Sequence, residues 1–159
     1  MYRALADWLA QSQFSETLQS LFWIIPTLQV FHILALAVVM ASVWMLYLRV
    51  IGVAGKAHSI ATMAARFLPW IWAALAVLAI SGTLLVIAEP RDSLLRPMMQ
   101  LKLVLLVVAI ALTLFFQQRV RRGAYADAGT IHAGTKLLGA VSLLVWLSIA
   151  VAGRLIAYV

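Results

Sequence analysis

Two polar side chains interrupt the longest uncharged apolar stretch of the chain, which runs from Leu21 to Leu48. Gln29 and His32 are three residues apart, so on a helix they lie on one face. With Trp23 at one membrane interface, His32 lies roughly 13 Å below it at about 1.5 Å of rise per residue. An ionisable group is costly at that depth, so we expect His32 to face protein, a cofactor or a cavity. His32 is therefore the first candidate for chemistry.

One firmly placed imidazole can hold a b-type haem in an apolar slot between helices. His32 is then an axial ligand, and it is also the metal-ligand candidate inside a span. No second histidine lies at its depth, so a bis-histidine haem needs a second copy of the chain across a two-fold axis. Met98 and Met99 lie nearer the surface and become ligands only if the loop before them folds inward. The alternative is a structural histidine that hydrogen-bonds to Ser81, Ser148 or a freed carbonyl, and both interpretations stay open here.

Glu89, Lys102 and Arg154 form a second group, expected near the same end of the spans as His32. Their opposite charges could pair and shape a mouth that leads down to His32 and faces haem propionates or a quinone head group. In the other interpretation, Lys102 and Arg154 extend to the lipid headgroups and Glu89 caps a turn.

The remaining histidines, His58 and His132, fall in two connections on the opposite side, with Asp127 as the nearest acid. Their spacing matches no metal motif, which favours solvated loop histidines. The chain also has no Gly-rich phosphate loop, no Ser–His–acid spacing and no paired carboxylates inside a span. We therefore expect no enzyme in the ordinary sense, and a redox carrier at most.

Composition points to an integral membrane protein, because 65% of the 159 residues are hydrophobic and only 11% are charged. The length allows a single membrane domain, residues 1–159. The chain has no cysteine, which excludes disulfides, thiolate metal sites and cysteine nucleophiles. The net charge of +7 gathers at the ends of the apolar runs, a pattern of membrane orientation, so we expect no nucleic-acid partner.

Four apolar runs predict an all-α, integral membrane four-helix bundle with a short N-terminal interfacial helix. The predicted spans cover residues 21–48, 67–88, 98–116 and 137–158. Ser15 is a candidate N-cap in the N-terminal region, Pro26 a candidate bend, and Pro69 suits the first turn of the second span. Glu89-Pro90 should end that span. Small residues in the fourth span predict close helix packing; they are Gly139, Ser142, Ser148, Ala152 and Gly153.

The segments WIIPTLQVFH, YLRVIG, RFLPWIWAALAVLAISGTLLVIAEP, QLKLVLLVVAIAL and SLLVWLSIAVAGRLIAYV together resemble an uncharacterised bacterial family of small four-helix membrane proteins. The resemblance covers nearly the whole chain and implies a fold but no activity. It marks as motif positions Pro26, His32, Arg49, Pro69, Gly82, Pro90, Lys102, Gly153 and Arg154. The chain departs from the family pattern at Gln29, where a Glu is frequent, and at Tyr47, where an Asp is frequent. His32 therefore lacks the carboxylate partner of a proton relay. At fold level the chain also looks like small haem-bearing or copper-resistance bundles.

These observations predict a multi-pass protein of the bacterial inner membrane that binds haem b through His32 and transfers electrons. The lipid bilayer is its first partner, and a homodimer or larger oligomer, a quinone and a periplasmic redox protein are the others we expect. The competing hypotheses are a non-catalytic structural or partner subunit of a membrane complex, and a transporter of small solutes or metal ions. The absence of carboxylates inside the spans disfavours the transporter.

Basic residues predict the orientation. The connections after the first and third spans carry a net charge of +6, against +1 for the opposite side. The positive-inside rule places the two basic connections in the cytoplasm and both termini in the periplasm.

The orientation can be tested by cysteine labelling, because the natural chain has no cysteine. Single cysteines in place of Gly55 or Gly123 should react only with a reagent supplied from the cytoplasm. A cysteine in place of Ser93 should react only from outside. Labelling of the Ser93 position from the cytoplasm would invert the topology.

Overall fold

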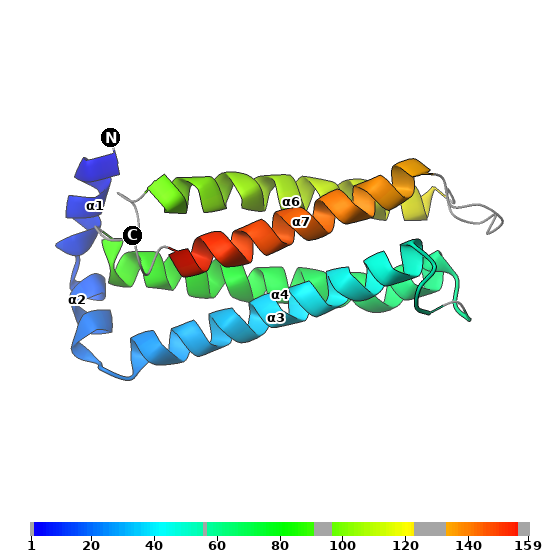
Figure 1. Ribbon diagram of the computed structural model, residues 1–159. Helices are drawn as coiled ribbons and strands as arrows, with labels where there is room; N and C mark the ends of the chain where they lie inside the picture. The colour runs from blue at the N-terminus through cyan, green and yellow to red at the C-terminus, as the bar shows by residue number, and fades with distance from the viewer. Residues whose placement is uncertain (1, 56, 91–96, 123–132, 156–159) are drawn as a thin grey trace.

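The computed structural model is built of helices (Figure 1) and describes residues 2–55, 57–90, 97–122 and 133–155. The helices are α1 (Tyr2–Ala10), α2 (Gln13–Ser20), α3 (Ile24–Val50), α4 (Ile60–Ala88), α6 (Pro97–Arg121) and α7 (Ala133–Leu155). The described ranges contain no strand, so the expected all-α class is confirmed. Four of these helices, α3, α4, α6 and α7, are long and apolar enough to cross a membrane.

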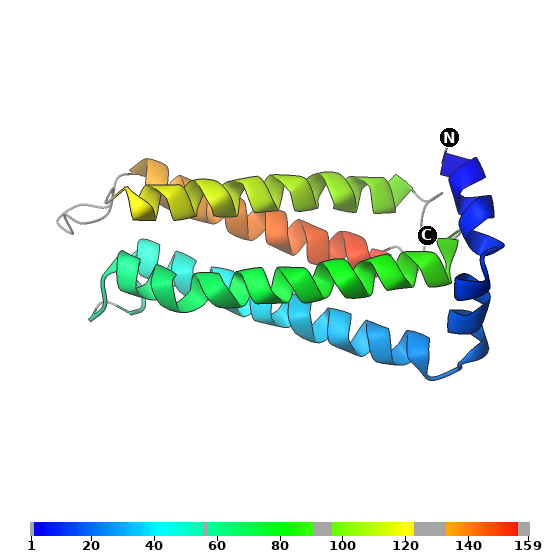
Figure 2. The same cartoon turned by 180° about the vertical axis from the view of Figure 1, so that it is seen from behind.

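The four long helices lie side by side, and α1 with α2 crosses one end of the bundle (Figure 1). We call this the α1–α2 end; it also carries the last turn of α7. α3 packs most extensively on α4, α6 packs on α7, and the two pairs meet mainly through α3 and α7. The view from behind shows α4 and α6 in front of α3 and α7 (Figure 2), and α4 and α6 also contact each other, less extensively. The bundle is therefore two helix hairpins joined along the α3–α7 seam.

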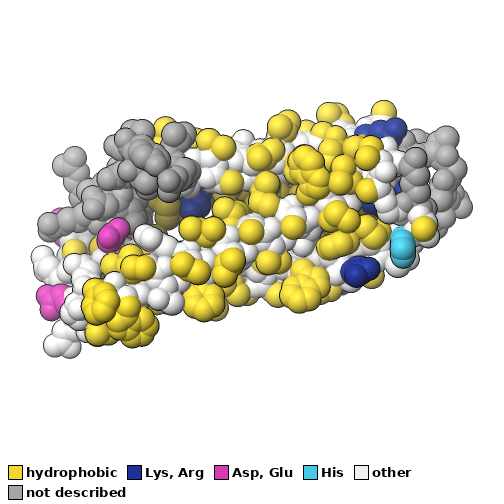
Figure 3. Space-filling model, turned by 60° about the horizontal axis from the view of Figure 1, so that its bottom comes forward, with side chains coloured by type: hydrophobic (Ala, Val, Ile, Leu, Met, Phe, Trp, Pro, Cys, Tyr) yellow, Lys and Arg dark blue, Asp and Glu magenta, His cyan; other side chains and the backbone are white. Residues whose placement is uncertain are grey.

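Large apolar side chains cover the outside of the bundle, as a helix surface in lipid requires. Phe31, Leu34, Val107 and Leu144 are among the exposed ones, and Figure 3 shows apolar side chains along the length of one face. The core is a separate stripe on each helix, with Val39, Ile71, Ala109, Trp146 and Ile149 as buried members. A hydrophobic outside together with a hydrophobic inside is the composition of a multi-pass membrane protein.

The second long helix begins earlier than the hydropathy predicts. Ser59, in extended conformation, caps α4 by accepting a hydrogen bond from the Thr62 backbone N–H. Pro69 therefore lies inside α4 and not in its first turn. The predicted span starts too late because Arg66 interrupts the apolar run, although most residues from Ile60 to Arg66 are apolar.

Pro26 does not bend α3. The helix begins at Ile24, so Pro26 lies in the first turn, where its missing N–H would have had no helical acceptor. Glu89-Pro90 ends the second span as the sequence predicts. The helix α4 ends at Ala88, and its C-cap residue Glu89 lies directly before Pro90.

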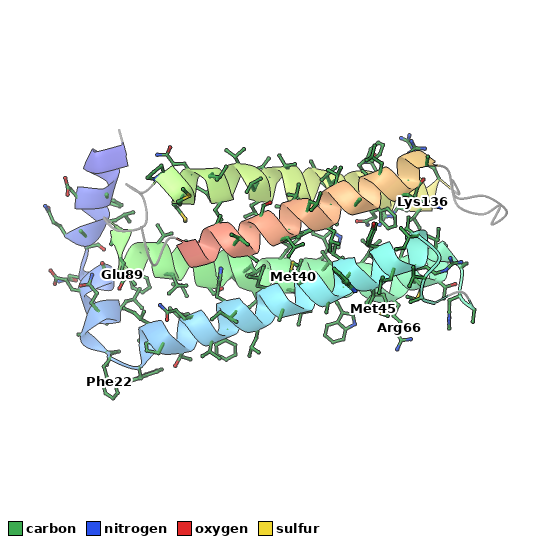
Figure 4. All side chains as sticks on the ribbon, viewed as in Figure 1. Phe22, Met40, Met45, Arg66, Glu89 and Lys136 are labelled. Atoms are coloured by element: carbon green, nitrogen blue, oxygen red, sulfur yellow. The ribbon has the colours of Figure 1, made fainter. Side chains whose placement is uncertain are left out.

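The N-terminal region folds as two short helices, and Ser12, not Ser15, is the N-cap that separates them. Ser15 is fully buried inside α2. Gln19 of α2 donates a hydrogen bond of 2.7 Å to the Ala88 carbonyl, a free acceptor at the end of α4. This bond fastens α2 across the α1–α2 end. Phe22, which follows α2, is 89% exposed and projects away from the bundle in Figure 4, as an aromatic anchor at a membrane interface would.

Glycine allows the closest approach along the α3–α7 seam. A Cβ atom added to Gly139 of α7 would lie 2.8 Å from Cδ2 of Tyr47 on α3. This is the close packing through a small residue that the fourth span predicts. The contact also fixes the register of the two antiparallel helices, since it pairs residue 139 with residue 47.

Gly139→Ala should lower the stability of the purified protein in detergent by about 1–3 kcal/mol, because the Tyr47 ring must move. Gly134→Ala, in the same helix with nothing near the added Cβ, is the matched control. It should be neutral or should stabilise by up to about 1 kcal/mol through helix propensity. Thermal unfolding of both variants checks the seam, and equal stability of the two would show that Tyr47 does not pack there.

Candidate functional site

His32 forms a hydrogen bond to a second helix. Its Nδ1 atom lies 2.8 Å from Oγ of Ser81 on α4, and Ser81 is buried with 3% of its surface exposed. The Ser81 hydroxyl proton points to the Val77 carbonyl, 2.6 Å away. A hydroxyl has one proton, so Ser81 accepts from His32, and Nδ1 of the neutral imidazole carries hydrogen. Nε2 then keeps its lone pair, and no described residue forms a hydrogen bond with it.

Gly82, next to Ser81, makes room for the imidazole. A Cβ atom at this position would lie 3.3 Å from Cε1 of His32 and 3.8 Å from Nδ1. The ring therefore rests against the backbone of α4 while its Nδ1–H bonds to the neighbouring serine. Two consecutive residues of α4 thus fix both the position and the tautomer of His32.

Lys102 comes to the same level from the other helix pair. Its Nζ atom would lie 3.5 Å from a Cβ on Gly153, so the side chain extends from α6 across α7. The contact between Gly139 of α7 and Tyr47 of α3 gives the depth of this lysine relative to α3. Because the two helices are antiparallel, 14 residues forward from Gly139 and 14 residues back from Tyr47 lead to the same level. These positions are Gly153 and residue 33, next to His32. This register places the Lys102 ammonium at about the same depth in the bundle as His32. All four long helices therefore bring residues of the candidate site to about one depth: His32, Ser81, Gly82, Lys102 and Gly153.

The profile of the family of unknown function DUF6644 matches residues 13–159. The chain belongs to this family. The expected membership of an uncharacterised family is thus confirmed, and the description of the family gives no activity. No curated protein and no solved structure matches the chain. Within this DUF6644 protein, the site has to be interpreted from its own residues.

Other predicted partners of His32 lie elsewhere. Ser148 is exposed, and its hydroxyl donates to the Leu144 carbonyl one turn earlier. It is two residues from the buried Trp146 and therefore points away from the core. Gln29 is also exposed. Leu28, one helical turn before His32, is half-buried and lies on the same side of α3 as His32, whereas Gln29 does not.

Glu89 and Arg154 do not complete the expected charged mouth in the described structure. Glu89 is exposed at the α1–α2 end of α4 (Figure 4), and it forms no ion pair with a described residue. Arg154 lies in α7, but its side chain is outside the described part. Met98 and Met99 are half-buried in the first turn of α6. Lys102 is thus the charged residue that the described site contains.

The basic and histidine-bearing connections lie away from this site. Figure 4 shows Arg66 and Lys136 at the end opposite α1 and α2. His58 is exposed there, and its carbonyl accepts a hydrogen bond from Nε of Arg49. His132 and Asp127 are outside the described residues. Among the residues that the structure describes, no three His, Cys, Asp or Glu side chains gather as a metal site would require.

Sequence reasoning did not single out Trp146, whose side chain is fully buried with no hydrogen-bond partner for its indole Nε1–H in the described structure. Tryptophans in membrane proteins concentrate at the two interfaces. A tryptophan in the middle of the fourth span is therefore unusual, and its position in the sequence could have indicated that Trp146 is buried. The register places it opposite residue 40 of α3, about two helical turns below His32. It therefore belongs to the core beneath the site.

Ser81→Ala should destabilise the protein by about 1–2 kcal/mol, because the His32 Nδ1–H loses its acceptor in an apolar interior. Ser148→Ala is the matched control, since that serine bonds only to its own helix, and it should change stability little. Repeating Ser81→Ala in a His32→Ala background should remove most of its effect. An unchanged effect in that background would contradict the hydrogen bond.

Proposed function

We propose that this DUF6644 protein is a b-type haem-binding electron-transfer protein of the bacterial inner membrane, with Nε2 of His32 as an axial ligand. One observation carries the proposal. The His32–Ser81–Val77 chain of hydrogen bonds directs the imidazole proton to Nδ1 and leaves the Nε2 lone pair for a ligand. Haem-ligating histidines need this arrangement, because a hydrogen bond at the second nitrogen fixes the tautomer and orients the ring.

The surroundings of His32 suit a haem in three further respects. The walls of the bundle are apolar, which excludes water and matches the porphyrin. Because residues 82 and 153 are glycines, no side chain projects from these positions of α4 and α7 toward His32 and Lys102. Lys102 supplies a positive charge at about the depth of the imidazole, where an anionic edge of the group could bind. When bound, haem supplies one-electron chemistry; the protein's own residues hold it, orient it and keep it dry.

The depth of His32 decides where electrons would be exchanged. His32 is eight residues from the start of α3, roughly 12 Å along the helix axis from the α1–α2 end. A quinone or a redox protein would approach from this end, which the charge distribution assigns to the periplasm. The described residues provide no second histidine at this level, so a second imidazole would come from His32 of another copy in a homodimer.

A structural role is the second candidate, and one observation favours it. The 2.8 Å bond between His32 and Ser81 already ties α3 to α4 and satisfies Nδ1 without any cofactor. In that case the protein is a partner subunit of a membrane complex. The absorption spectrum separates the two functions, because only the haem protein has a Soret band.

His32→Ala should abolish the Soret and α/β bands of the purified protein while the helices still insert, since the apolar spans do not depend on one imidazole. Added imidazole should restore part of the spectrum by supplying the nitrogen without its tether. His58→Ala, at the opposite end, is the control and should leave the spectrum unchanged. A colourless parent protein, or a spectrum that survives His32→Ala, would refute the haem assignment.

A further inference from the structure

We infer that Lys102 is the binding point for a carboxylate group on a ligand held between the two helix pairs. The inference rests on the proposed function where that carboxylate is a haem propionate. The same chemistry would also receive the carboxylate of a long-chain fatty acid from the bilayer, and the experiment below distinguishes the two sources.

The position of the ammonium group is the first argument. A lysine near the end of a membrane helix usually extends along its own helix to the headgroups. Lys102 is the sixth residue of α6 and half-buried, and its Nζ lies against the backbone of α7 at Gly153. Because a glycine lies there, no side chain of α7 covers the ammonium group at this contact. The ammonium, with its three hydrogen-bond donors, therefore lies between α6 and α7 at about the level of His32.

The absence of a counter-charge is the second argument. Lys102 forms no ion pair and no hydrogen bond with any residue that the structure describes. Asp7, Glu16 and Glu89, the described acids, all lie outside the four long helices. A charge inside a membrane protein is normally paired or functional. Here an anion brought by a ligand would complete the pair.

Access is the third argument. Lys102 is half-buried, and its neighbours in α6, Leu101 and Leu103, are exposed apolar side chains. A carboxylate on a long or broad apolar body fits this combination, since its charged group meets the ammonium while its body lies against the helices. A free inorganic anion would lack the apolar contacts. The imidazole of His32, at about the same depth as Lys102, would then contact the body of the same ligand.

The inference can be tested by titrating the purified protein with three probes: haemin, haemin dimethyl ester and palmitate. The protein for this titration is isolated haem-free from haem-deficient cells. The ester has the same ring as haemin but no carboxylates. Lys102→Met keeps the length of the side chain and removes its charge, and Lys102→Arg keeps the charge. Lys136→Met, which removes a lysine at the opposite end, is the control.

Lys102→Met should weaken haemin binding about ten- to hundredfold, the range of a hydrogen bond to a charged group, and leave the ester unaffected. Lys102→Arg should keep most of the affinity, and Lys136→Met all of it. Palmitate binding that depends on Lys102, with no binding of haemin, would keep the carboxylate site and refute the haem function. Equal binding of every probe to the parent protein and Lys102→Met, in samples with unchanged thermal unfolding, would overturn the inference.

Discussion

A polar side chain inside a membrane bundle has no water to bond with, and this constraint decides which groups of the chain remain available for chemistry. Five serine and threonine hydroxyls of the spans donate to the carbonyl one turn earlier on their own helix. The bonds run from Thr27 to Trp23, Ser81 to Val77, Thr83 to Ala79, Thr113 to Ala109 and Ser148 to Leu144. Once its proton is used in this way, a hydroxyl can only accept. Ser81 is the member of this set whose oxygen meets a donor from another helix, and that donor is His32.

The consequence for His32 is a defined chemical state. A histidine in the same place beside a carboxylate would gain a proton acceptor that also attracts positive charge. This chain has Gln29 where such a carboxylate would stand, and Gln29 is exposed. The imidazole is therefore held by a neutral serine and by the open surface of Gly82. Such an arrangement presents a lone pair, which suits ligation, and offers no relay for protons.

Hydropathy and residue spacing predict the helices well and the site only in part. Long apolar runs must be helical in lipid, so the four spans follow from composition alone. The start of α4 does not, because Arg66 interrupts the apolar run, and the cap signal at Ser59 competes with the stronger apolar signal after Arg66. The sequence predicts that Ser81 and Ser148 both lie near the depth of His32. Which of the two serines faces His32 depends on the rotation of each helix about its own axis. That rotation depends on packing such as Gly139 against Tyr47, which spacing along one helix cannot reveal.

The site joins two parts of the bundle that otherwise meet along one seam. His32, Ser81 and Gly82 belong to the α3–α4 pair, whereas Lys102 and Gly153 belong to the α6–α7 pair. A ligand that contacts both pairs adds its binding free energy to their association, and at a concentration of 100 times its Kd this amounts to about 2.7 kcal/mol. The two hairpins differ in what they offer. One presents a neutral nitrogen with a fixed direction, and the other presents a positive charge on a long side chain. A ligand with a metal centre and an anionic edge meets both requirements at once, whereas the carboxylate of a fatty acid would use the charge of Lys102 and leave the nitrogen of His32 without a metal.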